Sequence, residues 1–214
     1  MPDKKLLVIG ASSGIGLATV QAACESGLSV TAFARRASQM PFSHNALTKI
    51  DGDALVATDV NHALQNIDAV VLSLGVPFNL RLFTGPITLF SAATKVVLQQ
   101  MQKVGVQRLV CITGFGAGDS IRAIHPLQRI GFNLVFGRAY GDKSIQEEQI
   151  VASNLQWTIA RPGVLTNGMR KPYQILTQPD TWRNGIISRA NVADFVVSAI
   201  IEESYIGQSP VLIG

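Results

Sequence analysis

Three glycines and two serines near the start of the chain have the types and spacing of an anion-binding turn. Gly10, Gly14 and Gly16 stand at the spacing G-x-x-x-G-x-G, and Ser12 and Ser13 lie between the first two. Glycine permits a tight turn, a close approach of the backbone to a ligand and close packing of a helix on a strand. The pattern therefore indicates a turn that holds a pyrophosphate, with an ordinary glycine-rich connection as the alternative.

The flanking sequence supplies the elements that would position this turn. Residues 6–9 form an unbroken apolar run, typical of a strand buried on both faces of a parallel sheet. A helical pattern of apolar residues then extends from Ile15 to Cys24. The N-terminus of such a helix directs unpaired N–H groups and the positive end of its dipole at the turn. With a strand before the turn and a helix after it, the sequence favours dinucleotide binding.

Two arginines indicate which dinucleotide fits. Arg35 and Arg36 directly follow a second predicted strand, and no Asp or Glu occurs between Val30 and Lys49. An acidic residue at this position would bind the ribose 2′-hydroxyl of NAD, whereas arginine accommodates the 2′-phosphate of NADP. Guanidinium groups bind phosphate through paired hydrogen bonds. We expect NADP(H), with a pair of solvated surface arginines as the alternative.

Strand and helix patterns alternate along the rest of the chain, which predicts right-handed βαβ units. We expect an α/β fold in which a doubly wound parallel sheet lies between two helical layers, with ligands at the carboxyl ends of the strands. The predicted strands are 6–9, 28–34, 47–50, 68–74, 106–113, 155–160 and 210–213, and the predicted helices are 15–24, 59–65, 87–104, 143–152 and 191–202.

Two less regular segments follow the fifth and sixth predicted strands. Residues 114–141 contain several glycines and an apolar patch, and residues 164–188 have no long periodic pattern. A long connection at the ligand end of a sheet is typical of a loop or lid over a substrate. We therefore predict two substrate-side loops within one domain over residues 1–214, and a helix that begins at Lys143 with Asp142 as its N-cap.

Composition narrows the class of protein. The 214 residues are 47% hydrophobic and 15% charged, which is typical of a compact domain. No apolar run is long enough to cross a membrane and no signal peptide is recognisable, so we expect a cytoplasmic protein with no membrane partner. The net charge of +4 comes from scattered Lys and Arg, which favours an anionic small molecule over nucleic acid. The Cys, His and acidic residues have no metal-ligand spacing, and a monomer or a homodimer is equally compatible with the sequence.

Several motifs together resemble a known superfamily. They are VIGASSGIG (8–16), DAVVLSLG (68–75), RLVCITGFGAG (108–118), YGDKSIQEEQI (140–150) and LQWTIARPGVLTNG (155–168). The chain resembles the short-chain dehydrogenase/reductase superfamily, in particular the atypical NAD(P)-binding branch that includes biliverdin reductase B and the NmrA-like proteins. The resemblance implies a Rossmann-type fold. One departure is the glycine turn, because these nearest relatives usually carry G-x-x-G-x-x-G.

The resemblance also implies a set of cofactor-binding residues. The turn would wrap the pyrophosphate, the two arginines would face the 2′-phosphate, and an aspartate after the third strand would bind the adenine amino group. Residues after the fourth strand would border the nicotinamide ribose, and residues at the end of the sixth would line the carboxamide. In that order they are Gly10, Ser12, Ser13, Gly14, Ile15 and Gly16; Arg35 and Arg36; Asp53 with Ala54; Leu74, Gly75 and Val76; and Arg161, Pro162, Gly163 and Val164.

Superfamily enzymes usually carry a catalytic serine after the fifth strand and a Y-x-x-x-K motif in the next helix. Here the resemblance implies that Thr113 replaces the serine and polarises a carbonyl, and that Lys143 is the lysine that holds the ribose. Ala139 occupies the usual tyrosine position, and the nearest tyrosine is Tyr140. On a helix Tyr140 would point about 100° away from the usual direction. A helix that begins only at Lys143 would leave Tyr140 free to aim elsewhere, so it is either the proton donor or a structural or lid residue.

The function that the resemblance implies is an NADPH-dependent reductase. It would transfer hydride to a small planar or carbonyl-bearing acceptor such as a quinone, flavin, tetrapyrrole, aldehyde or ketone. Two alternatives remain open. NmrA-like relatives bind the dinucleotide without turnover and act as redox sensors, and epimerases or dehydratases share the fold but have a larger substrate domain than the residues after 163 provide.

Overall fold

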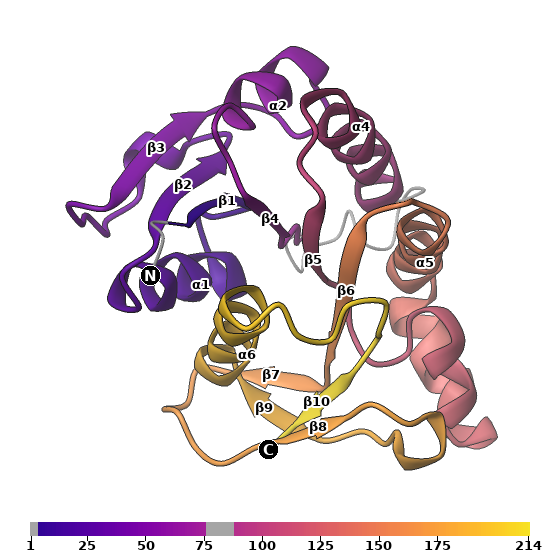
Figure 1. Ribbon diagram of the computed structural model, residues 1–214. Helices are drawn as coiled ribbons and strands as arrows, with labels where there is room; N and C mark the ends of the chain where they lie inside the picture. The colour runs from indigo at the N-terminus through magenta and orange to yellow at the C-terminus, as the bar shows by residue number, and fades with distance from the viewer. Residues whose placement is uncertain (1–3, 76–87) are drawn as a thin grey trace.

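The computed structural model describes residues 4–75 and 88–214, apart from the side chains of residues 126–136. An eight-stranded sheet runs through the molecule in the order β3-β2-β1-β4-β5-β6-β10-β8 (Figure 1). All neighbouring strands are parallel except β10 and β8. The strands are β1 (Lys5–Ile9), β2 (Ser29–Ala34), β3 (Leu47–Asp51), β4 (Ala69–Leu72), β5 (Arg108–Ile112), β6 (Gln156–Pro162), β8 (Gln174–Leu176) and β10 (Val211–Ile213). The predicted α/β fold is confirmed.

Helices cover both faces of the sheet, as Figure 1 shows. On one face α1 packs against α6, and on the other α4 packs against both α2 and α5. A separate parallel pair of short strands, β7 and β9, lies beside the sheet. The bounds are α1 (Gly14–Glu25), α2 (Ala57–Ala63), α4 (Leu89–Val104), α5 (Pro126–Val151), α6 (Arg189–Ile201), β7 (Val164–Thr166) and β9 (Ile186–Ser188), with the 3-10 helices η1 (Ala37–Gln39), η2 (Gly118–Ala123) and η3 (Pro179–Thr181).

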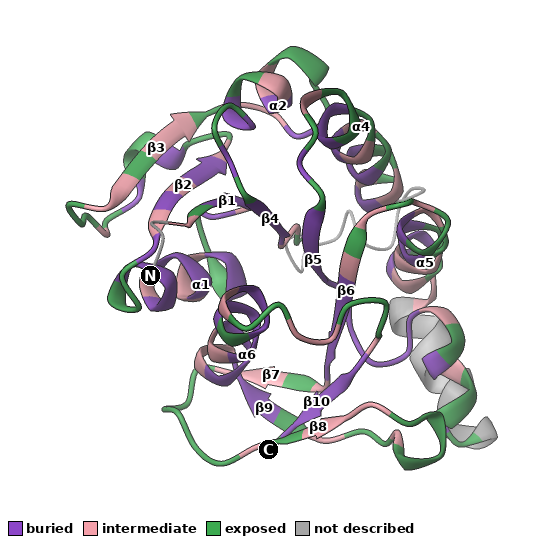
Figure 2. Cartoon of the chain, in the orientation of Figure 1, coloured by how far each residue is buried: buried purple, intermediate pink, exposed green. Residues whose placement is uncertain are grey.

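The apolar run in β1 is continuous because the strand has a hydrophobic core on each side. Leu6 and Val8 belong to the core beneath α1 and α6, whereas Leu7 and Ile9 belong to the core beneath α2, α4 and α5. Successive side chains of a strand point to opposite faces, so each face receives two of the four. Figure 2 shows the buried residues concentrated along these central strands.

The prediction that residues 114–141 are irregular is wrong for the second half of that segment. After η2 the chain enters α5 at Pro126, which stands at the first helical position, and continues without a break to Val151. Gly131, Gly137 and Gly141 each weaken an isolated helix by about 1 kcal/mol, which is why the sequence did not indicate one there. Proline at the first position of a helix was the available signal for its start.

Asp142 is not the N-cap of its own helix. It lies within α5, is buried, and accepts hydrogen bonds from the backbone N–H groups of Phe90 (2.8 Å to Oδ2) and Ser91 (3.3 Å to Oδ1). These groups open α4, whose N-cap residue Thr88 makes no side-chain capping bond. Asp142 therefore supplies from α5 the carboxylate that the start of α4 lacks.

Candidate functional site

The glycine turn lies where the strand order reverses. The chain leaves β1 between β2 and β4, and a Cβ on Gly10 would clash with the carbonyl oxygen of Ser73, just after β4. A Cβ on Gly16 would clash with the carbonyl oxygen of Gly10. These two glycines allow the turn, the first helix and β4 to approach closely. Such a reversal point opens the crevice in which doubly wound sheets bind ligands.

Gly14 differs from the other two glycines. Its φ is +59°, and the position of its missing Cβ has nothing within 4 Å. Ser12, Ser13 and Gly14 are all exposed, while Ile15 is buried in the core. The turn therefore presents backbone and hydroxyl groups to the open side, and the Ile15 side chain anchors it from below.

The first turn of α1 suits an anion. Its N-cap residue, Ser13, makes no side-chain capping bond, and the turn contains no acidic residue. The N–H groups and positive dipole end at a helix N-terminus attract negative charge. The residues present thus fit the pyrophosphate of a dinucleotide.

Arg35 and Arg36 are both exposed and directly follow β2, the strand next to β1. The loop that carries them is fixed by Asp51, whose carboxylate accepts hydrogen bonds from the backbone N–H (2.7 Å) and hydroxyl (2.6 Å) of Ser38. These bonds lower the pKa of the Asp51 carboxyl. The arginines can therefore extend from an ordered loop towards a phosphate beside the turn.

The predicted adenine and ribose residues lie at the ends of β3 and β4. Asp53 accepts a hydrogen bond from Leu55 N (2.9 Å) within its own turn, and Ala54 is buried beside it. Leu74 is half-buried and Gly75 is exposed, two and three residues after β4. Val76 lies outside the described residues.

Lys143 lies on α5 and points at the end of β5. Its Nζ donates to the carbonyl oxygen of Thr113 (2.9 Å) and lies 4.4 Å from the centre of the Phe90 ring. Burial lowers the pKa of the Lys143 ammonium, and the Glu147 and Asp142 carboxylates only partly oppose this. Lys143 is a mid-helix residue rather than the first-turn residue that the sequence predicts.

Tyr140 is also part of α5, so the prediction that it lies in irregular backbone is wrong. Its hydroxyl reaches Gly114: a Cβ on Gly114 would be 2.7 Å from the hydroxyl oxygen. Burial raises the pKa of the Tyr140 phenol above its ordinary value of 10.0, so the group stays protonated at neutral pH. Tyr140 and Lys143, three residues apart on one helical face, converge on the Thr113–Gly114 turn.

Thr113 differs from the expected arrangement. Its hydroxyl is buried and donates to Oε1 of Glu147 (2.6 Å), because a carboxylate can only accept. The residue after β5 that faces the tyrosine hydroxyl is instead Gly114, which has no side chain. The structure thus directs the hydroxyl proton of Thr113 to Glu147 rather than to a substrate.

Glu147 and Arg161 form a buried ion pair behind this turn. Arg161 donates through Nε to Oε1 (3.2 Å) and through Nη2 to Oε2 (2.6 Å) of Glu147. Burial alone would lower the pKa of the Arg161 guanidinium, but hydrogen bonding and attraction to Glu147 outweigh it and the pKa is raised. Glu147 was missed as a site residue. Its spacing of four from Lys143, which places both on one helical face, was the signal.

The end of β6 presents mainly backbone to the carboxyl edge of the sheet. The Arg161 and Pro162 side chains are buried, and a Cβ on Gly163 would clash with the carbonyl oxygen of Gly185, just before β9. Val164 is 56% exposed. Of the four residues predicted to line the carboxamide, only Val164 has an exposed side chain.

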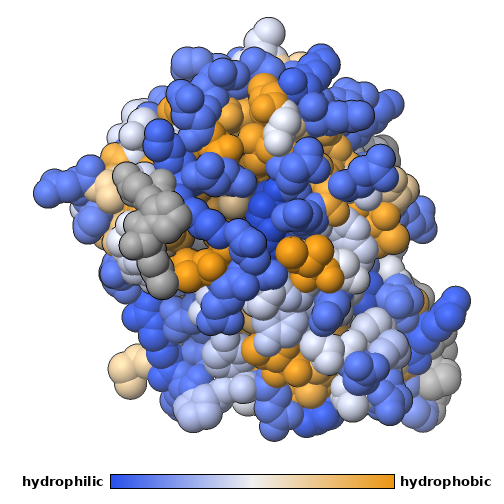
Figure 3. All heavy atoms as spheres, viewed as in Figure 1, coloured by the Kyte–Doolittle hydropathy of each residue, from blue (hydrophilic) through white to orange (hydrophobic). Residues whose placement is uncertain are grey.

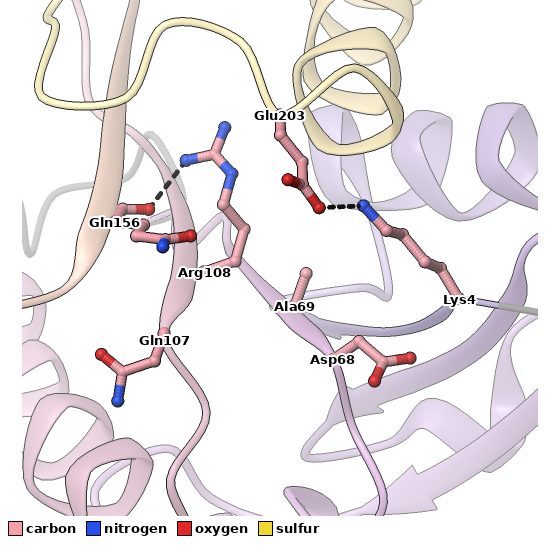
Figure 4. Close-up of a pocket in the computed structure, with 7 residues that line it drawn as sticks. All are labelled: Lys4, Asp68, Ala69, Gln107, Arg108, Gln156 and Glu203. Atoms are coloured by element: carbon pink, nitrogen blue, oxygen red, sulfur yellow. Dashed lines mark hydrogen bonds and ion pairs between the residues drawn. The ribbon is translucent and has the colours of Figure 1, made fainter. Parts of the chain in front are cut away.

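A hollow of about 330 Å³ lies at the opposite, amino-terminal edge of the sheet (Figure 4). The Arg108 guanidinium beside it donates to the carbonyl oxygens of Gln156 (2.8 Å), Ala199 (2.9 Å) and Ser204 (3.0 Å), and burial lowers its pKa to about 10. Arg108 thus holds the last turn of α6 against the sheet. Its role in this hollow is structural. The residues that could bind a cofactor or catalyse a reaction lie at the carboxyl edge of the sheet.

The comparisons with known proteins agree with this geometry. A family model described as NAD(P)H-binding matches residues 10–203. The chain belongs to the NAD(P)H-binding family.

Solved structures similar to this chain share its fold. ChuY of Escherichia coli O157:H7, described as an anaerobilin reductase, is 23% identical with a TM-score of 0.80, covering 98% of this chain and 97% of that one. A short-chain dehydrogenase/reductase from Veillonella parvula in complex with NADP is 16% identical with a TM-score of 0.79, covering 99% of this chain and 94% of that one.

A relative is also found by sequence. An uncharacterized chloroplastic protein of Arabidopsis thaliana is 27% identical over 206 residues, which are 94% of this chain and 73% of that protein.

Membership of the NAD(P)H-binding family fits the turn, the uncapped helix and the exposed arginines, so the predicted nicotinamide dinucleotide cofactor is confirmed. None of the helices in the described part of the chain is long and apolar enough to span a membrane. The face drawn in Figure 3 is mostly hydrophilic, and its hydrophobic atoms form several separate patches.

Proposed function

We propose that the protein is an NADPH-dependent reductase that transfers hydride to a small planar or carbonyl-bearing acceptor. The observation that carries the proposal is the convergence of the Tyr140 hydroxyl and the Lys143 ammonium on the Thr113–Gly114 turn. A lysine and a tyrosine that are both partly buried at the ligand edge of a sheet, with pKa values shifted by that burial, are typical of a catalytic site.

The chain's own residues would hold the cofactor along the carboxyl edge of the sheet. Gly14 and the α1 N-terminus, with Ser12 and Ser13, would bind the pyrophosphate, and Arg35 with Arg36 would bind the 2′-phosphate. The remaining contacts would come from Asp53 and Ala54 at the adenine, from Leu74 and Gly75 at the ribose, and from residues 161–164, chiefly through backbone, at the carboxamide. When bound, the nicotinamide supplies the hydride.

Tyr140 would supply the proton that accompanies the hydride. Because burial raises its pKa, the phenol is protonated across the neutral range and can act as a general acid. Lys143 would bind the ribose hydroxyls, anchored by the Thr113 carbonyl oxygen and the Phe90 ring. Hydride from the cofactor and a proton from Tyr140 balance the two-electron reduction of a carbonyl or a conjugated double bond.

The acceptor class follows from what a hydride donor and one phenolic acid can reduce. Quinones, flavins, aldehydes, ketones and tetrapyrroles all qualify, and a tetrapyrrole is supported by the structural likeness to ChuY, described as an anaerobilin reductase. The acceptor should be small, because the chain between β6 and α6 contains only three short strands, one 3-10 helix and the turns that join them.

A screen of NADPH oxidation against these acceptor classes tests the proposal. The expected result is saturable loss of NADPH absorbance with at least one class, slowed at least tenfold in Tyr140→Phe. Tight NADPH binding without turnover of any acceptor would favour a redox sensor instead. Conversion of a sugar nucleotide without net NADPH loss would favour an epimerase.

A further inference from the structure

The Glu147–Arg161 ion pair is almost completely enclosed. The two side chains are 4% and 5% exposed, and the guanidinium and carboxylate meet through two hydrogen bonds. Removing two charges from water costs about as much as their attraction returns, so a buried pair is weak evidence for stability. The pair does, however, fix the relative positions of the groups that it contacts.

That geometry extends directly to the Thr113–Gly114 turn. Oε1 of Glu147 accepts from the Thr113 hydroxyl (2.6 Å) as well as from Arg161 Nε. The carbonyl oxygen of Thr113 in turn accepts from Lys143 Nζ (2.9 Å). A continuous chain of contacts thus runs from Arg161 through Glu147 and Thr113 to Lys143, and it passes from β6 to α5 to the end of β5.

The same guanidinium contacts two segments on the substrate side of the sheet. Arg161 Nη2 pairs with Asp119 of η2 (2.6 Å), and the Trp182 ring, just after η3, lies 4.9 Å from the guanidinium carbon. Gly118 packs so closely on the pair that a Cβ there would clash with Oε2 of Glu147. The pair is therefore fixed from three directions.

We propose that Glu147 and Arg161 are a positioning pair for the reaction. They hold the Thr113 hydroxyl, and through it the main chain of Thr113 and Gly114. In this position the Thr113 carbonyl oxygen accepts the hydrogen bond from Lys143, and Gly114 leaves space for the Tyr140 hydroxyl. Thr113 is then a positioning residue whose hydroxyl serves Glu147. This assignment rests on the proposed reductase function for its effect on rate, but not for its effect on NADPH binding.

A double-mutant cycle between Thr113 and Glu147 tests the pair. Thr113→Val removes the hydroxyl at constant shape, and Glu147→Gln removes the charge that Arg161 needs while keeping an oxygen acceptor. We expect each single variant to lower kcat about tenfold and to raise the Kd for NADPH severalfold, and the double variant to be no worse than the poorer single one. Thr113→Ser, which keeps the hydroxyl, should recover most of the loss caused by valine.

Glu148→Gln is the matched control. Glu148 is the next residue on α5 and is exposed, so the same loss of charge there should change neither kcat nor Kd. Circular dichroism of each variant at the assay temperature shows that it is folded. If Glu147→Gln does not fold, the Kd of Thr113→Val for NADPH decides the matter, since this variant leaves the charge pair intact. A raised Kd that Thr113→Ser restores supports positioning, and a wild-type Kd with a lowered kcat means that the hydroxyl acts on the substrate.

Two results would overturn the assignment. If Thr113→Val lowers kcat while folded Glu147→Gln keeps the wild-type kcat and Kd, the hydroxyl acts on the substrate itself. If the effects of the two substitutions on NADPH affinity simply add, the residues do not act as a unit. Absence of wild-type turnover with every acceptor would remove the proposed function, while the NADPH-affinity cycle would still decide the positioning role.

Discussion

The hydroxyl of Tyr140 lies against Gly114, at the point where any side chain on residue 114 would displace it. Tyrosine and glycine are complementary here: the missing Cβ gives the room that the phenol occupies. The relationship explains how a tyrosine three residues before Lys143, rather than four, still reaches the end of β5.

Gly114→Ala should therefore act through Tyr140. The new Cβ, 2.7 Å from the hydroxyl oxygen, displaces the phenol, and we expect kcat to fall about tenfold with little change in NADPH affinity. Gly141→Ala is the control, because it adds a methyl group to open space on the same helix and should stabilise the fold by up to about 1 kcal/mol without changing kcat. Wild-type kcat in Gly114→Ala would mean that the tyrosine hydroxyl has no part in the reaction.

Lys143→Met should separate stability from function. Burial lowers the lysine pKa below its ordinary value of 10.5, so the folded state binds this proton less tightly than the unfolded state. The resulting cost is fully present below the folded pKa and disappears as pH rises through 10.5.

At neutral pH the free energy of unfolding of the methionine variant should therefore lie at most about 1 kcal/mol below that of the wild type. Towards alkaline pH the variant should lose stability relative to the wild type, because the wild type no longer bears the cost of the buried charge. NADPH affinity should fall at least tenfold. Urea denaturation at several pH values and fluorescence titration measure the two effects. Loss of stability with unchanged affinity would make Lys143 a structural residue.

Arg161→Met should be strongly destabilising. It leaves Glu147 buried without its partner, at a cost of about 3–5 kcal/mol in the free energy of unfolding. Arg170 pairs with Glu25 and Asp194 at the surface, so Arg170→Met should cost less than about 1 kcal/mol. Chemical denaturation of the two variants side by side measures the contrast, and equal costs would show that the Glu147 pair is not enclosed in solution.

Replacement of Arg35 and Arg36 by serine should change the cofactor preference. We expect NADPH affinity to fall by about ten- to a hundredfold while NADH affinity changes little, because only NADPH has the 2′-phosphate that the guanidiniums bind. Isothermal titration with both dinucleotides gives the ratio. A parallel fall for NADH would assign the arginines to another part of the cofactor.

The first half of the fold followed from the sequence because its signals are local. The apolar residues of β1 and the glycines after it define strand, turn and helix within a few residues, and Gly105 ends α4 as a left-handed C-cap. The placement of helices on both faces of the sheet then follows from the handedness of βαβ units.

The parts that the sequence did not predict depend on distant contacts. Residues 126–141 of α5 include three glycines and are helical against local preference, and Asp142 finds its partners on a different helix. The direction of the Thr113 hydroxyl is set by Glu147, 34 residues later, and no local pattern encodes it. Side-chain direction after a strand end is fixed by the helix packed over it.

The most direct test of the account follows the hydride itself. NADPH that carries deuterium at both positions of the reactive nicotinamide carbon is incubated with the wild-type protein and an acceptor from the screen that is reduced at carbon, and the reduced product is analysed by mass spectrometry. An aldehyde, ketone or tetrapyrrole is used because hydrogen transferred to a quinone or flavin ends on oxygen or nitrogen and exchanges with water. We expect one deuterium in each product molecule, formed at a rate that falls at least tenfold in Tyr140→Phe. Carbon-reduced product without deuterium, or NADPH bound and left unchanged in the presence of every acceptor class, would contradict the proposed hydride transfer.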